Sequence, residues 1–160
     1  MFTFFNKQKV STLYSPVNGE IIKLEALPDP VFSAKLMGEG FAVLPEKQTV
    51  FSPIEKGIVT SIFPTKHAIT IKTSECVELL IHMGIDTVDL DGEGFNLLVQ
   101  ENDKITKETV LAEVDLSLLE ERGKPTPIIV VLPEVAPEKV TISTFGKNHS
   151  GAEVGNVTLK

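Results

Sequence analysis

Apolar and polar residues alternate along most of the chain, and glycine, proline or aspartate interrupts the alternation at short intervals. A period of two is typical of strands with one buried face, because successive side chains of a strand point to opposite sides of the sheet. The interrupting residues are those that favour turns. We therefore expect a turn followed by a strand in residues 15–24, and further strands in residues 40–45, 56–63, 67–72, 77–82, 109–114 and 126–132.

One segment, residues 115–122, has the features of a short helix. Asp115 or Ser117 could cap its start, and Gly123 could end it. The pattern as a whole predicts an all-β fold, an antiparallel β-sandwich or flattened barrel with one or two short helical turns. We expect a short N-terminal arm at residues 1–14 and a single domain over residues 15–160.

Composition narrows the classes of partner and compartment. The 160 residues include 42% hydrophobic residues, which is enough for a core, and carry a formal net charge of −7 without a dense basic run. This charge disfavours nucleic acid as a partner and is compatible with docking to a basic protein. Cys76 is the single cysteine, so no disulfide can form within the chain. With neither a secretory signal nor a run of about 20 apolar residues, a cytoplasmic location is expected, and Met1 and Lys160 at the ends favour a stand-alone protein.

Two histidines flank the expected hairpin formed by residues 67–72 and 77–82. If Thr73 to Cys76 make the turn, Lys72 lies opposite Val77, and His67 then lies opposite His82. Directly opposed residues of antiparallel strands share a face and lie about 5 Å apart. In this register the pair sits at the end of an apolar stripe with Ile69, Ile71 and Leu80. A slip of one residue would send the two imidazoles to opposite faces.

Such a pair allows three interpretations. One imidazole could attack phosphorus while the other stabilises the phosphoryl oxygens, with Thr65 orienting one ring. The pair could also be a partial zinc site, or two histidines without chemistry. Asp29 and Asp86 are further candidates, although aspartates beside turns most often cap or solvate. The third histidine, His149, has no evident partner.

Three stretches, LPDPVFSAKLMGEGFAV (27–43), TKHAITIKTSECVELLIHMGIDTVDLDGEGF (65–95) and EVDLSLLEERGKPTPIIV (113–130), resemble the glucose-type enzyme IIA family of the bacterial sugar phosphotransferase system. The resemblance extends over residues 15–132 and implies an antiparallel β-sandwich with a shallow, apolar-rimmed active site. The chain departs from the family at Cys76, where relatives usually have glycine, and after Pro133, where the match is poor.

The resemblance also implies roles for particular residues. His82 would be phosphorylated through Nε2, His67 would position the phosphoryl group, and Thr65 would hydrogen-bond near the pair. Asp29 and Asp86 match the two acids that flank the site. The apolar rim that docks partners would consist of Val31, Phe32, Leu36, Met37, Phe63, Leu80 and Val88.

In such a carrier the phosphoryl group passes from phosphoenolpyruvate through enzyme I and HPr to this chain, and then to the IIB domain of a membrane sugar permease. No cofactor is required, although zinc could bind at His67 and His82. Regulated permeases or kinases could be further partners.

Three alternatives compete with the carrier. A zinc peptidase of the lysostaphin type would use the His-x-x-x-Asp of His82 and Asp86, but the His-x-His that such enzymes also need is absent. A lipoyl- or biotinyl-carrier module lacks a convincing lysine at a hairpin tip. The third is a repurposed fold that acts as a zinc-binding or regulatory protein-interaction module.

Overall fold

The computed structural model describes residues 9–159, which fold into antiparallel sheets with a few short helices. The strands are β1 (Val10–Tyr14), β2 (Gly19–Ile22), β3 (Glu39–Pro45), β4 (Thr49–Phe51), β5 (Lys56–Ile62), β6 (Ala68–Thr73), β7 (Glu78–Met83), β8 (Phe95–Leu97), β9 (Lys104–Thr106), β10 (Val110–Val114), β11 (Ile128–Leu132), β12 (Val140–Ile142), β13 (Gly146–Asn148) and β14 (Glu153–Thr158). The α-helices are α1 (Pro30–Ser33) and α2 (Leu116–Glu121), and the 3-10 segments are η1 (Leu24–Ala26), η2 (Thr87–Leu90) and η3 (Pro137–Lys139). None of the helices in this part of the chain has the length and apolar character that a membrane crossing requires.

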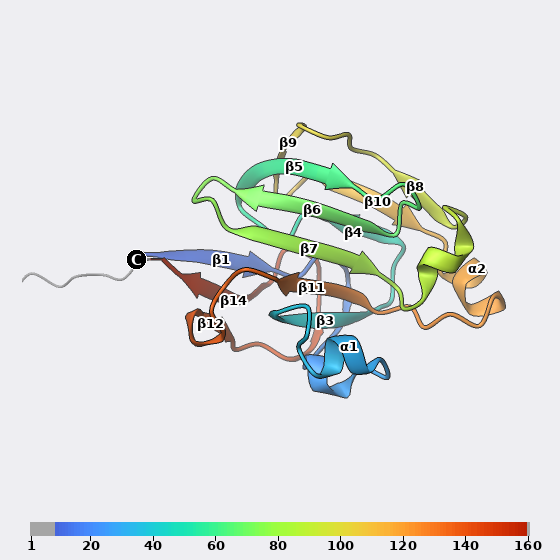
Figure 1. Cartoon of the computed structure of the whole chain (residues 1–160), viewed down its shortest axis with the longest axis horizontal. Helices are drawn as coiled ribbons and strands as arrows, with labels where there is room; N and C mark the ends of the chain where they lie inside the picture. The colour runs from blue at the N-terminus through green and yellow to red at the C-terminus, as the bar shows by residue number, and fades with distance from the viewer. Residues whose placement is uncertain (1–8, 160) are drawn as a thin grey trace, which may run out of the picture.

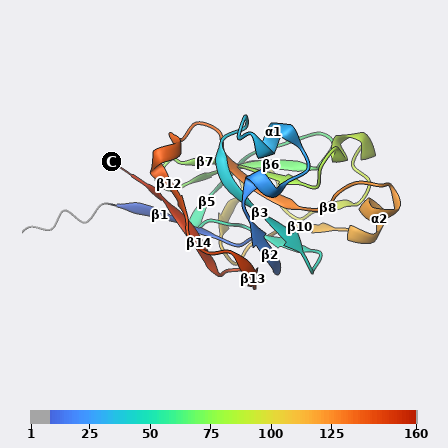
Figure 2. The ribbon, with the colours of Figure 1, turned by 90° about the horizontal axis from the view of Figure 1, so that it is seen from below.

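The largest sheet has eight strands in the order β13-β2-β3-β11-β7-β6-β5-β9. Two smaller sheets, β1-β14-β12 and β4-β10-β8, complete the fold. Figure 1 shows β5, β6, β7 and β11 side by side in the large sheet, with α1 below them and α2 at the opposite side from the C-terminus. Figure 2 shows α1 on one side of the molecule and β1, β14 and β13 on the other.

The two faces of the large sheet bury different sets of side chains. One face, called here the inner face, meets the small sheets in the main core, which includes Phe41, Ile69, Ile71, Ile81 and Val130 at 0% exposure. The other face, the outer face, is covered in part by η1 and α1. There a smaller cluster packs Leu24, Leu27, Phe32, Ala42, Ala68, Leu80, Ile85, Ile129 and Val131 together. Burial on both faces explains why β11 reads as a continuous apolar run.

The predicted all-β class is confirmed, as are the strands expected in the central part of the chain. Within residues 9–159 the sheets do not close into a barrel, so the sandwich form of the prediction holds. The predicted helix is α2, whose start is capped by Asp115 through a hydrogen bond from the Leu118 N–H. Residues 10–14, assigned above to an N-terminal arm, instead form β1 and pair with β14. Residues 1–8 of the expected arm lie outside the described residues.

The predicted register of the β6–β7 hairpin is wrong by one residue. Ala68, not His67, lies opposite His82, and Lys72 lies opposite Glu78. The turn explains the shift: the Thr73 N–H donates to the Val77 carbonyl, and Cys76 has a left-handed φ of 68°. This is a three-residue loop with its last residue in the left-handed conformation, rather than the expected four-residue turn. Ile69 and Ile71 therefore lie on the inner face, whereas Leu80 shares the outer face with His82.

Candidate functional site

The two histidines are in contact despite the shifted register. His82 lies on the outer face of β7, and its ring centroid is 4.9 Å from that of His67, with an angle of 78° between the planes. His67 comes just before β6, after Lys66 with its left-handed φ of 62°, so it does not follow the alternation of the strand. The turn therefore brings together two rings that a regular strand in this register would have separated.

Two phenylalanines extend the histidine pair into a row of four rings. Phe32 of α1 packs against His82 with centroids 4.9 Å apart, and Phe63 packs edge-on against His67 at 5.5 Å. Phe32 is 5% exposed and belongs to the cluster under α1, whereas Phe63 is 39% exposed. His67 is itself only 5% exposed, while His82 is partly buried. The rings place the histidines in an apolar surrounding at the surface of the sheet.

A backbone carbonyl sets the tautomer of His82. Nδ1 of His82 lies 2.7 Å from the carbonyl oxygen of Gly84. A carbonyl can only accept, so Nδ1 donates its proton, and Nε2 of the neutral ring keeps a free lone pair. Gly84 has a left-handed φ of 78°, and an added Cβ would come within 2.5 Å of Cγ2 of Thr87. Thr87 also donates to the Met83 carbonyl at 2.7 Å, which ties this turn to η2.

His67 has a side-chain partner of its own. Oγ1 of Thr65 lies 2.7 Å from Nδ1 of His67. A threonine hydroxyl can donate or accept, so this bond allows either tautomer. When Thr65 donates, the proton of His67 sits on Nε2, from where it can be offered to an oxygen near the pair.

Burial keeps both histidines neutral. Loss of hydration lowers the pKa of His82 from 6.5 to about 4, and the charge of His67 adds to the depression, while the Gly84 carbonyl, Asp29 and Asp86 oppose it. Burial also lowers the pKa of His67. Desolvation is the largest of these effects on His82, so the ring is uncharged and nucleophilic at neutral pH.

Asp29 and Asp86 flank the site from two different elements. Asp29 caps α1, since its carboxylate accepts from the Val31 N–H at 2.9 Å. Asp86 has a left-handed φ of 59° and comes just before η2. Both act on the pKa of His82 through their charge alone, and neither touches it by a hydrogen bond in the described structure. Because neither carboxylate bonds to His82, the two aspartates are placed to add negative charge near the histidine pair rather than to transfer a proton.

The expected apolar rim divides into exposed and buried members. Val31, Leu36, Met37, Phe63 and Val88 are 40%, 73%, 37%, 39% and 51% exposed. Phe32 and Leu80, which were placed in the rim with them, are only 5% and 4% exposed and pack in the cluster under α1. Phe32 packs against His82, and Leu80 is two residues before His82 on the same face of β7.

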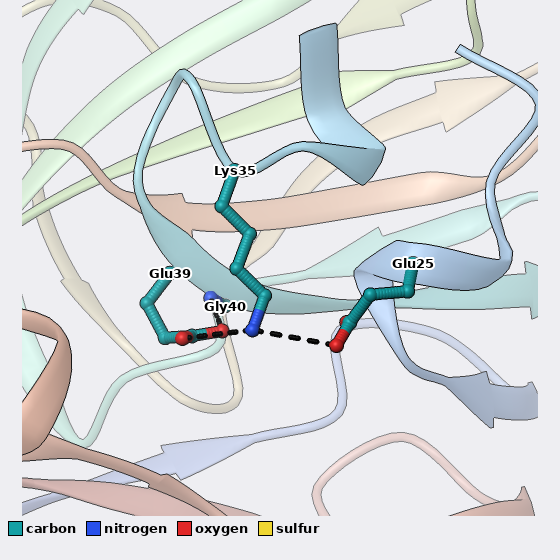
Figure 3. A network of polar contacts seen from close by, with 4 residues as sticks. All are labelled: Glu25, Lys35, Glu39 and Gly40. Carbon is teal, nitrogen blue, oxygen red and sulfur yellow. Dashed lines mark hydrogen bonds and ion pairs between the residues drawn. The ribbon is translucent and has the colours of Figure 1, made fainter. Parts of the chain in front are cut away.

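A lysine holds the α1 loop to the sheet, and the sequence analysis did not find it. Nζ of Lys35 lies 3.1 Å from Glu39 at the start of β3 and 3.5 Å from Glu25 of η1, as Figure 3 shows. Glu39 also accepts from the Gly40 N–H at 3.3 Å. The hydrogen bond to Glu39, together with the two carboxylate charges, raises the pKa of Lys35. This clamp joins the two ends of the loop that carries Phe32.

The described residues contain no group of three or more histidine, cysteine or acidic side chains placed to hold a metal ion. His67 and His82 could supply two nitrogen ligands, and a zinc site of the usual kind needs four ligands. The zinc hypothesis stays a prediction that requires ligands from elsewhere.

Sequence reasoning missed the Gly84 carbonyl as well as the Lys35 clamp. A backbone oxygen has no signature in the sequence beyond the glycine that permits its turn. Lys35 stands four residues before Glu39, a spacing that could have suggested the ion pair on a helix, but the pair spans a turn and a strand.

Comparisons with known proteins identify the family that this chain resembles. The model of the family described as "phosphoenolpyruvate-dependent sugar phosphotransferase system, EIIA 1" matches residues 11–136. A glucose-specific EIIA component of Staphylococcus aureus is 46% identical over 125 residues, which cover 77% of this chain and 75% of the relative. A glucoside-specific EIICBA component of Staphylococcus carnosus is 41% identical over 144 residues, and the match spans 90% of this chain but only 21% of that longer protein.

A solved structure extends the likeness to three dimensions. The glucose permease IIA from Mycoplasma capricolum superposes with a TM-score of 0.83 at 33% sequence identity. The match covers 97% of this chain and 99% of the other. It therefore includes the C-terminal strands, where the sequence resemblance was poor.

Proposed function

Because the chain belongs to the EIIA 1 family of the phosphoenolpyruvate-dependent sugar phosphotransferase system, we propose that it carries a phosphoryl group on Nε2 of His82. The donor is phospho-HPr, and the acceptor is the IIB domain of a sugar permease. The observation that carries this proposal is the bond from Nδ1 of His82 to the Gly84 carbonyl, which leaves Nε2 free. The low pKa of His82 supports it, since a protonated imidazole has no lone pair to attack phosphorus.

In the forward step, Nε2 of His82 attacks the phosphorus and the bond from phosphorus to the donor breaks. The electron pair of that bond leaves with the donor. Phosphoryl transfer needs mainly positioning and charge stabilisation from the protein. His67 supplies both when Thr65 donates to its Nδ1, because Nε2–H of His67 then faces the phosphoryl oxygens.

The exposed rim supports a docking role for the same face. Five apolar side chains between 37% and 73% exposed lie on α1 and the turn after it, before β6 and on η2, and one of them, Phe63, contacts His67. Exposed apolar patches mark interaction sites on soluble proteins. Asp29 and Asp86 add negative charge at its edge, which suits a basic surface on HPr. The cytoplasmic location expected above follows from these partners and stays part of the proposal.

Intact-mass spectrometry after incubation with phosphoenolpyruvate, enzyme I and HPr tests the carrier. We expect the gain of one acid-labile phosphoryl group in the wild type and no gain in His82→Ala. His149→Ala is the matched control, because His149 is exposed and its ring bonds to the Ser150 carbonyl, away from the histidine pair. Phosphorylation of His82→Ala, or no gain in the wild type while HPr itself is phosphorylated, would contradict the proposal.

The role of His67 is tested by separating acceptance from delivery. His67→Gln should still gain the phosphoryl group, and should pass it on slowly when a glucose-family IIB domain is added. Loss of acceptance in His67→Ala, with acceptance retained in His82→Ala, would reverse the two roles.

A further inference from the structure

A hollow lies on the large sheet, away from the histidines. It has a volume of about 420 Å³ and is lined by residues of β5, β6 and β9 and of the turn after β6. Its β6 residues, Lys72 and Thr73, stand at the end of that strand that joins the hairpin turn, whereas His67 precedes the other end. Volumes of this size are usual for small-molecule sites.

Three lysines from three strands converge on this hollow: Lys56 of β5, Lys72 of β6 and Lys104 of β9. The pairing explains their convergence. Ile58 of β5 lies opposite Lys72 on one side and opposite Lys104 on the other, so the two lysines flank it on one face. Lys56 is two residues before Ile58 and points to the same face.

The three ammonium groups lack compensating ion pairs. Among the described residues, no carboxylate lies within 4.0 Å of any of them. Glu78 is the acid opposite Lys72 on β7, and it is the only acid in that cross-strand row of β9, β5, β6 and β7. The hollow is thus locally positive on a chain with a net charge of −7.

The floor of the hollow is apolar. Ile58 lines it together with the backbone of Gly57 and of Ile105, whose side chain is buried in the main core on the inner face, and Ser74 adds a hydroxyl at its edge. An inorganic anion would use the lysines and leave this floor without a partner. A ligand with a carbon skeleton and a phosphate uses both, since the skeleton covers Ile58 and the phosphate meets the ammonium groups.

We propose that this three-lysine hollow, formed around Lys56, Lys72 and Lys104, binds a small organic phosphate. It lies on the same outer face as His82, because Lys72 is four residues after Ala68 on β6 and Ala68 is directly opposite His82. Four residues of a strand span roughly 13 Å. The ligand therefore binds beside the histidine pair without touching it.

Amide chemical shifts in a titration of the full chain with glucose 6-phosphate test the proposal. Saturable shifts are expected at Gly57, Ile58, Ser74 and Ile105, and they should weaken as the salt concentration rises. Glucose, which lacks the phosphate, should leave these amides unchanged. The measurement does not depend on phosphoryl transfer, so its outcome is separate from that of the carrier proposal.

Two double variants with the same change of charge assign the site. Lys56→Ala/Lys72→Ala should weaken binding by about tenfold or more, as expected for the loss of at least one charge-assisted contact. Lys47→Ala/Lys139→Ala removes two exposed lysines elsewhere and should leave binding unchanged.

Equal weakening in the two double variants would overturn the proposal, because binding would then reflect only overall charge. Shifts that map to His82 instead of the hollow, or no saturable shifts, would overturn it too. Inorganic phosphate that binds as tightly as glucose 6-phosphate would show that the apolar floor plays no part, and the ligand class would be wrong.

Discussion

The protonation of His82 allows a quantitative test of the site. With a pKa of about 4, roughly 3% of the rings are protonated at pH 5.5, whereas an ordinary histidine with a pKa of 6.5 is about 90% protonated. Nitrogen shifts of the imidazole ring, measured by NMR between pH 7.5 and pH 5.5, distinguish the two cases. They also identify the tautomer, which we expect to carry its proton on Nδ1 because of the Gly84 carbonyl.

The same depression of the pKa makes stability depend on pH. Between the folded value of about 4 and the unfolded value of 6.5, the unfolded chain binds more protons at His82, so the free energy of unfolding falls as the pH is lowered. The His82 contribution is unaffected above that window. Protonation of His82 in the unfolded chain should lower the free energy of unfolding by about 1.3 kcal/mol when the pH falls from 7.5 to 5.5. Measurements stop at pH 5.5 because the sequence pI is close to 5.0.

Urea unfolding of the wild type and of His82→Gln isolates this contribution. The wild type should lose about 1.3 kcal/mol more than the variant between the two pH values, since glutamine does not titrate. His67, whose pKa is also lowered, is present in both proteins, so the difference contains the His82 contribution together with its coupling to His67. A ring of His82 that is mostly protonated at pH 5.5, or an equal pH dependence of the two proteins, would refute the reasoning.

Three further substitutions probe the supports of His82. Phe32→Ala opens His82 to water, so the pKa of His82 should rise toward 6.5 in an NMR titration, and burial of the lost ring implies a cost of about 3 kcal/mol in urea unfolding. Gly84→Ala combines an unfavourable left-handed φ with the contact to Thr87, so it should cost about 2 kcal/mol and weaken the Nδ1 bond seen in the ring nitrogen shifts. Lys35→Met breaks two partly exposed ion pairs and should cost no more than about 1 kcal/mol, while amide exchange in the α1 loop becomes faster.

Controls for these substitutions come from the same chain. Phe63→Ala removes the other ring of the row, which is 39% exposed and contacts His67, so it should leave the pKa of His82 nearly unchanged. Gly123→Ala has a left-handed φ of 70° but nothing within 4 Å of its new Cβ, so it should carry the backbone cost without the change at His82. Lys147→Met breaks an exposed pair with Glu46 and should leave exchange in the α1 loop unaffected. A control that matches its test variant would contradict the assigned contact.

The local signals in the sequence were sufficient for the central strands and for α2. Strands with one buried face alternate between apolar and polar residues, whereas β11, which is buried on both faces, is a continuous apolar run. The helix α2 carries its capping aspartate and terminal glycine in the order that helices require. The family resemblance also predicted that His82, His67 and Thr65 lie together in one site. These features depend on residues close in the sequence or on motifs that span it.

The register of the hairpin depended on a backbone conformation. Cys76 adopts a left-handed φ that is uncommon for residues other than glycine, and this changed the loop from four residues to three. Lys66, also left-handed, then turned His67 toward His82. The left-handed conformation of Cys76 alone would have placed His67 and His82 on opposite faces of the sheet. The left-handed conformation of Lys66 restored their contact, and side-chain patterns encode neither conformation.

The sequence by itself determined the strand pattern, the short helix and the family whose histidines carry the proposed chemistry, because each is written in local periodicity or in a motif. Only the tertiary structure decided that residues 10–14 and the C-terminal segment pair as β1 and β14, and that Gly84 selects the tautomer of His82. It also decided that Phe32 and Leu80 are buried in the cluster under α1 rather than exposed in the rim. Strand partners distant in the chain, backbone acceptors and the loss of hydration at a ring all depend on what the folded chain brings together, and no single segment carries that information.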